Sequence, residues 1–243
     1  MCKSEGHGPT RFPVRDARSS MLNFPPTGTD LTIGLAAFLL GWYVIGLHLS
    51  RRRGGALVRQ IRDSIQFFGG AATIRWIGRS AFRIEVEPLA PPLSRLGVSL
   101  LMEPRETFLL WAFGRLSGRR DWLKVSVTLS GGVKGAFEVY HPQRRGGADS
   151  AHEVRSLGWA VEPFPGRAEL LCAAPGPDGR ALAQEVMGVL RGLEIWGVRV
   201  RNKEPQLTVS LPLPVTETRV PLPIFPLLAH LAQLILAGGF VRS

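Results

Sequence analysis

The chain has 243 residues, 45% of them hydrophobic, and a formal net charge of +11 from 30 basic and 19 acidic side chains. A charged fraction of 20%, together with 6 Trp and 12 Phe, excludes a chain that is disordered throughout. The two cysteines, Cys2 and Cys172, are too few for a disulfide framework or a thiolate zinc site. The strong basic balance would suggest a nucleic-acid partner if it were spread over a folded face.

The excess positive charge is concentrated in one stretch. Residues 51–83 contain eight arginines and one aspartate, whereas residues 84–243 contain 18 basic and 15 acidic side chains and have a net charge of only +3. The larger part of the chain is therefore only mildly basic. This distribution makes nucleic acid the weakest of the candidate partners.

The stretch before the arginines predicts a membrane span. Residues 31–50, LTIGLAAFLLGWYVIGLHLS, carry no charged side chain. A helix of this length rises about 30 Å, the thickness of a bilayer core. A signal peptide has its basic residues before the apolar region, and no small-x-small cleavage site lies between Leu47 and Arg53. We predict a retained transmembrane helix, with a buried core helix as the alternative.

The charges on either side of the span predict its orientation. Three arginines precede it (Arg11, Arg15 and Arg18), and five follow it closely (Arg51, Arg52, Arg53, Arg59 and Arg62). The positive-inside rule then predicts a single-pass protein of the cell membrane with an outer tail, residues 1–30, and a cytoplasmic domain, residues 70–243. Met21 is an alternative start to Met1, in which case residues 1–20 are not translated.

The residues after the span form a basic juxtamembrane segment, 51–69. Leu57, Ile61 and Ile65 recur at helical spacing, which predicts an amphipathic helix along the inner membrane surface. The five arginines that follow the span are predicted to contact the anionic inner leaflet, where each contributes about 1 kcal/mol. The alternative is that they are a topology signal with no lipid selectivity.

Residues 70–243 have the pattern of an α+β domain. Apolar alternation predicts strands at 72–77, 81–86, 96–102, 122–129, 136–140, 159–161, 169–173, 195–200 and 206–211. Helical spacing predicts helices at 106–116, 148–157, 178–193 and 221–237. The order predicts one or more antiparallel sheets with helices packed on one face, and it is compatible with tandem split β-α-β units. For residues 222–241, a core helix is favoured over an interfacial or membrane helix.

No catalytic, cofactor-binding or metal-binding residues are predicted. The chain has no phosphate-binding glycine motif, zincin motif or G-x-S-x-G elbow. Arg115, Arg119 and Arg120 lie at the end of a predicted helix, next to Asp121. These arginines either have a structural role, in which they complement the helix dipole, or a functional role, in which they contact a partner.

Two patterns resemble a known family. Residues 118–123, GRRDWL, lead from an apolar helix into a strand, and the strand 207–211 is followed by a proline-containing loop and the helix 222–235. With a membrane helix before a cytosolic α+β domain, the chain resembles the calumin family, single-pass coiled-coil proteins of the eukaryotic multipass translocon. The resemblance covers about residues 100–140 and 205–237. It implies help in membrane-protein insertion, with no catalytic residues to transfer.

The chain departs from that family at both ends. It shows neither the long acidic segment before the membrane helix nor the charged coiled-coil tail that the family carries to the ribosome. Ribosome contact is therefore not expected.

The sequence as a whole predicts a membrane-anchored binding or scaffold protein, an accessory factor in membrane-protein insertion or assembly. Its expected partners are the lipid bilayer and other membrane proteins or translocon components. The alternative is a membrane-anchored enzyme of unrecognised type.

Overall fold

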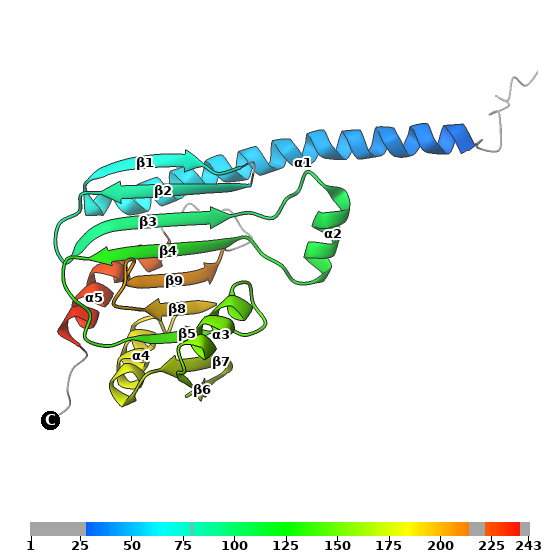
Figure 1. Cartoon of the computed structure of the whole chain (residues 1–243). Coiled ribbons are helices and arrows are strands. Elements are labelled where there is room, and N and C mark those ends of the chain that lie inside the picture. The colour runs from blue at the N-terminus through cyan, green and yellow to red at the C-terminus, as the bar shows by residue number, and fades with distance from the viewer. Residues whose placement is uncertain (1–27, 79, 214–221, 239–243) are drawn as a thin grey trace, which may run out of the picture. The chain divides into compact units, whose positions relative to one another are not determined.

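The computed structural model describes residues 28–78, 80–213 and 222–238 (Figure 1). Within these ranges the protein is α+β, with five α-helices and one nine-stranded antiparallel sheet. The chain divides into two compact units, residues 1–39 and 40–243, and the whole sheet lies in the second. The strands are β1 (Ala71–Trp76), β2 (Ala81–Glu87), β3 (Leu93–Leu101), β4 (Trp122–Leu129), β5 (Phe137–Tyr140), β6 (Ala160–Phe164), β7 (Arg167–Ala174), β8 (Gly197–Val200) and β9 (Leu207–Pro212). The helices are α1 (Gly28–Ile65), α2 (Phe108–Leu116), α3 (Gly147–Ser156), α4 (Pro177–Val189) and α5 (Ile224–Ala237).

Helix α1 contains both the predicted span and most of the basic segment after it. It runs for 38 residues without interruption, and a short 3-10 helix, Gln66–Phe68, follows it. Among the described residues, it is the one helix that is long and apolar enough to cross a membrane, by length and composition.

The second half of α1 is part of the core of the domain. Leu57, Ile61 and Ile65 are buried with the apolar residues of the sheet. The hydroxyl of Ser64 accepts a hydrogen bond from the backbone N–H of Leu222, at 3.2 Å, just before α5. The sequence places this apolar side on the membrane surface, and the structure corrects that prediction. The domain buries these side chains because its sheet offers a continuous apolar face.

The strand order in the sheet is β1-β2-β3-β4-β9-β8-β5-β7-β6. The central strand β4 alternates as its sequence predicts: Leu123, Val125 and Val127 are buried, and Lys124 and Ser126 between them are half-buried on the opposite face. Since Val125 lies opposite Val209 of β9, the apolar residues of neighbouring strands share one face. This face carries the main core.

The predicted architecture is confirmed in part. All nine strands form one antiparallel sheet, and it contains two split β-α-β units: α3 connects β5 to β6 on either side of β7, and α4 connects β7 to β8 on either side of β5. The strands β3 and β4, which α2 connects, are direct neighbours and form no such unit. The prediction that the helices share one face is wrong. Helices α4 and α5 pack on the main core, whereas Val154 of α3 packs with Tyr140 and Ala173 on the other side. Element order could not show this, because strand pairing depends on contacts between distant segments.

Helix α5 is a core helix, as favoured from the sequence. Its apolar stripe, including Phe225, Leu228 and Leu231, is fully buried. This burial contradicts the interfacial and membrane alternatives for residues 224–237.

Helix α2 has an unusual position. It joins β3 to β4, which are antiparallel neighbours paired from Leu93↔Leu129 to Leu101↔Trp122. A connection between neighbouring antiparallel strands does not have to cross the sheet. Helix α2 therefore extends beyond the end of the β3–β4 pair and lies beside α1 (Figure 1).

Candidate functional site

Helix α2 exposes a continuous apolar surface. Its sequence, FLLWAFGRL, contains one charged residue, Arg115, whose side chain lies outside the described part of the structure. Leu110 is 58% exposed, Phe113 66% and Leu116 85%, and Leu109 is similar. Soluble domains rarely expose so many neighbouring large apolar side chains, and such patches mark interaction sites.

The inner side of α2 stacks on α1. The ring centroid of Trp42 lies 4.9 Å from that of Phe108, edge to face, and 5.2 Å from that of Trp111. The Trp42 indole N–H also donates a hydrogen bond to the backbone carbonyl of Arg105, at 3.0 Å. These contacts hold α2 and the segment before it against residues 42–46 of α1.

Gly46 allows the close approach of these segments. A Cβ atom at this position would lie 2.3 Å from the carbonyl oxygen of Arg105 and 2.9 Å from Cα of Glu106. No side chain larger than hydrogen fits there without a backbone shift. By contrast, a Cβ atom at Gly41, five residues earlier, meets nothing within 4 Å.

Asp121 connects α1 to the segments on either side of α2. Its carboxylate accepts a hydrogen bond from the backbone N–H of Glu103, at 2.8 Å. It also forms ion pairs with Nε of Arg53, at 2.9 Å, and with Nη2 of Arg105, at 3.2 Å. The Asp121 side chain is 4% exposed and that of Arg53 is 12% exposed. Asp121 therefore provides a buried negative charge for arginines from two elements.

A cavity of about 280 Å³ lies among these residues. Apolar side chains of α1 and α2 form one side of it: Trp42, Ile45, Leu49 and Trp111. The charged lining comprises four arginines and two carboxylates: Arg53, Arg105, Arg119, Arg120, Glu103 and Asp121. The cavity, which we call the arginine pocket, is thus apolar on one side and formally positive on the other.

The structure brings together residues that the sequence analysis treated separately. Arg53, predicted to contact lipid, and Arg119 and Arg120, predicted to contact a partner, all line the arginine pocket. Arg120 lies 3.4 Å from the carboxylate of Glu194 in an exposed ion pair. Arg105 was missed, because a single arginine between a strand and a helix has no spacing that relates it to α1.

The remaining predicted lipid-contact residues lie on α1, outside the arginine pocket. Arg51, Arg52, Arg59 and Arg62 are all exposed. Arg62 lines another cavity, next to β1 and β2. Their contact with lipid remains a prediction.

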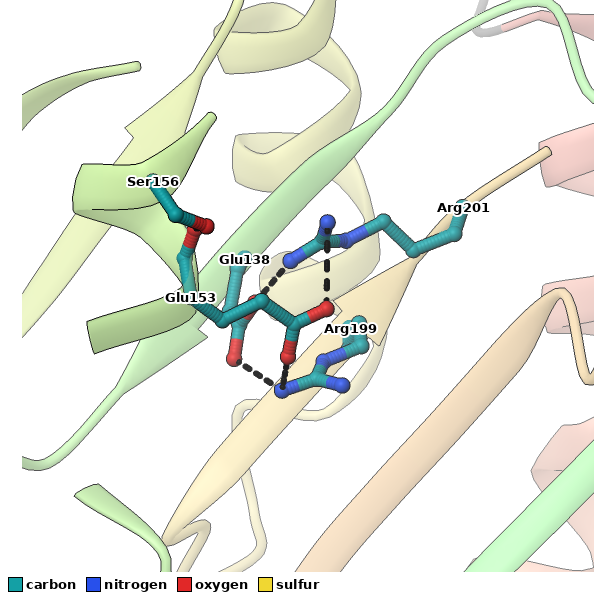
Figure 2. Close-up of polar contacts among 5 residues, drawn as sticks. All are labelled: Glu138, Glu153, Ser156, Arg199 and Arg201. Atoms are coloured by element: carbon teal, nitrogen blue, oxygen red, sulfur yellow. Dashed lines mark hydrogen bonds and ion pairs between the residues drawn. The ribbon is translucent and has the colours of Figure 1, made fainter. Parts of the chain in front are cut away.

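A second charged cluster joins α3 to the sheet (Figure 2). Glu138 of β5 is 2% exposed and pairs with Arg199, at 2.8 Å, and with Arg201. Glu153 of α3 reaches the same two arginines, at 2.8 Å and 3.5 Å. The Arg201 guanidinium lies 4.5 Å from the ring centroid of Trp159. Two carboxylates balance two arginines, so we interpret this cluster as structural.

The other titratable groups give little indication of chemistry. Burial, followed by the charge of Arg199, lowers the pKa of Lys124. Burial raises the pKa of the Cys172 thiol to about 11, so this side chain is a thiol at neutral pH. Within residues 28–78, 80–213 and 222–238, no three His, Cys, Asp or Glu side chains gather as metal ligands would.

Comparison with known proteins adds no relative. No protein-family model matches the chain, and no curated protein matches it. The resemblance to the calumin family remains a prediction from the sequence.

Proposed function

We propose that this protein is a single-pass membrane protein whose α+β domain is docked on the cytoplasmic membrane surface. There it serves as a binding scaffold in the insertion or assembly of other membrane proteins. The observation that carries the proposal is the apolar outer surface of α2, held beside Trp42 of α1.

The depth of Trp42 supports the docking of α2. Trp42 precedes Arg51 by nine residues, which is about 13 Å along a helix axis. With Arg51 at the membrane surface, Trp42 lies within the inner leaflet. Phe108 and Trp111 stack on Trp42, so α2 enters the leaflet with it. The bilayer then covers apolar side chains that water would otherwise contact.

The domain contacts the membrane through two helices, α1 and α2, and this restricts its orientation. Residues 40–65 of α1 and the whole of α2 belong to the same unit as the sheet. A domain on a flexible linker would sample many orientations, whereas this one presents a constant surface to neighbouring membrane proteins. Such a fixed presentation suits a scaffold.

Purification of the full-length protein from its native membranes in mild detergent tests the scaffold role. We expect recovery of a complex with an integral membrane protein. The variant Leu110→Ser/Phe113→Ser should remain membrane-bound through α1. Because its α2 no longer docks in the leaflet, the domain should lose its fixed orientation and with it this partner. Leu157→Ser, an exposed leucine of the domain away from α2, serves as the control and should retain it. Recovery of the unaltered protein as a lone monomer would contradict the scaffold role.

Cysteine labelling tests the orientation. Asn202 lies in an exposed turn between β8 and β9. Asn202→Cys in a Cys2→Ser background should react with a membrane-impermeant maleimide only after the cells are permeabilised. Reaction in intact cells would place the domain outside.

A further inference from the structure

We propose that the arginine pocket binds the phosphate of an anionic phospholipid, with the acyl chains against the apolar side of the pocket. This inference rests on the proposed membrane docking and names a ligand for it. The arginines of the pocket recognise a phosphate group, and its apolar side selects a lipid over a soluble phosphate.

The polarity of the pocket follows the axis of α1. Trp42, Ile45, Leu49 and Arg53 line it at intervals of three or four residues, so they lie along one side of the helix. Ile45 and Leu49 precede Arg53 by about 12 Å and about 6 Å. The apolar end of the pocket is therefore the deeper one in the bilayer, and the arginines lie near the surface. A phospholipid of the inner leaflet has the same order of chains and headgroup.

The charge of the pocket favours an anion. Asp121 is shared by Arg53 and Arg105. Arg119 and Arg120 bring the lining to four arginines against two carboxylates. Arg119 forms no ion pair within the described parts of the chain, and Arg120 has only the exposed contact with Glu194. Guanidinium groups bind phosphate oxygens in pairs of hydrogen bonds.

The size of the pocket also suits a lipid headgroup. A volume of about 280 Å³ lies at the lower end of the range for small-molecule sites. It accommodates a phosphate and a glycerol unit, and the exposed side chains of Ile45 and Leu49 continue into the bilayer where the acyl chains would lie.

Tryptophan quenching by brominated lipids tests this inference on the full chain in phosphatidylcholine nanodiscs. Either brominated phosphatidylglycerol or brominated phosphatidylcholine is added at one fixed mole fraction. The difference in fluorescence quenching between the protein and its Trp111→Phe variant isolates the quenching of Trp111, which lines the pocket. We expect severalfold stronger apparent binding of the anionic lipid, and Arg119→Gln/Arg120→Gln should reduce this preference to near unity.

The control variant is Arg51→Gln/Arg52→Gln. It removes the same charge from the same membrane surface but outside the pocket. Any lipid that Arg51 and Arg52 attract lies outside the pocket, so the preference for phosphatidylglycerol that Trp111 reports should be retained. If both variants lose the preference for phosphatidylglycerol equally, the lipid is attracted diffusely to the leaflet and the inference is overturned.

Three further outcomes distinguish a lipid from a free phosphate ester and the phosphate site from the membrane docking. If soluble glycerol phosphate displaces the lipid at millimolar concentration, the site is one for a free phosphate ester and the lipid assignment fails. If brominated phosphatidylcholine quenches Trp111 but the anionic lipid shows no preference, docking stands and only the phosphate site fails. If neither lipid quenches Trp111, the docking of α2 itself is wrong.

Discussion

The Asp121 carboxylate lies 2.9 Å from Nε of Arg53, which ties the residue before β4 to the third arginine after the predicted span. The two residues are far apart in the sequence, and both line the arginine pocket. Their pairing also means that Arg53 has a structural role in addition to any contact with lipid.

Asp121→Asn should destabilise the protein by about 2–3 kcal/mol. The change removes the negative charge shared by Arg53 and Arg105, and loss of one partner from a buried ion pair is costly. Urea unfolding in detergent measures the free energy. Asp63→Asn, on the exposed side of α1, should change it by less than about 0.5 kcal/mol. Equal stability of the two variants would show that Asp121 does not hold these segments together.

Glu138→Gln should cost about 3 kcal/mol, because it leaves Arg199 and Arg201 beside a neutral amide in a buried position. Glu162 makes a similar contact with Arg180, at 2.7 Å, but both side chains are about half exposed. Glu162→Gln should therefore cost less than about 1 kcal/mol. Thermal unfolding of both variants compares a buried and an exposed ion pair on one sheet. Similar losses of stability in the two variants would contradict the difference in burial.

Gly46→Ala should loosen the contact between α1 and α2, since the new Cβ atom would lie 2.3 Å from the Arg105 carbonyl oxygen. We expect a loss of about 2 kcal/mol in unfolding free energy and a change in tryptophan fluorescence as Trp42 moves from Trp111. Gly41→Ala is the matched control, because its Cβ atom has open space and helix propensity favours alanine. A stable Gly46→Ala variant with unchanged fluorescence would refute the close approach.

The Cys172 thiol should make stability fall with pH in the alkaline range. Its folded pKa is raised to about 11 from an ordinary value of 9.0, so the folded state retains its proton when the unfolded state has lost it. The contribution is complete below about pH 9 and is lost as the pH rises towards 11, by at most about 1.4 kcal/mol per pH unit. Urea unfolding at several pH values measures this slope. Cys172→Ala should have a shallower one, and identical slopes would contradict the shift.

The sequence by itself determined the elements of the domain. The alternation in 122–129 predicted β4 with its observed bounds, and the apolar stripe of 221–237 predicted a core helix. The uncharged stretch 31–50 predicted the helix that could span a membrane. These features are local, since a period of 2 or 3.6 residues and the absence of charge are visible in a single segment.

Only the tertiary structure decided the strand order, the two faces of the sheet and the composition of the arginine pocket. Helix α2 has the spacing of an ordinary amphipathic helix, and its position beyond the end of the sheet follows from the pairing of β3 with β4. Likewise, Arg53, Arg105 and Asp121 meet because α1 packs on the same domain from which α2 extends. Such contacts join segments many residues apart, and local periodicity contains no information about which distant segments pair.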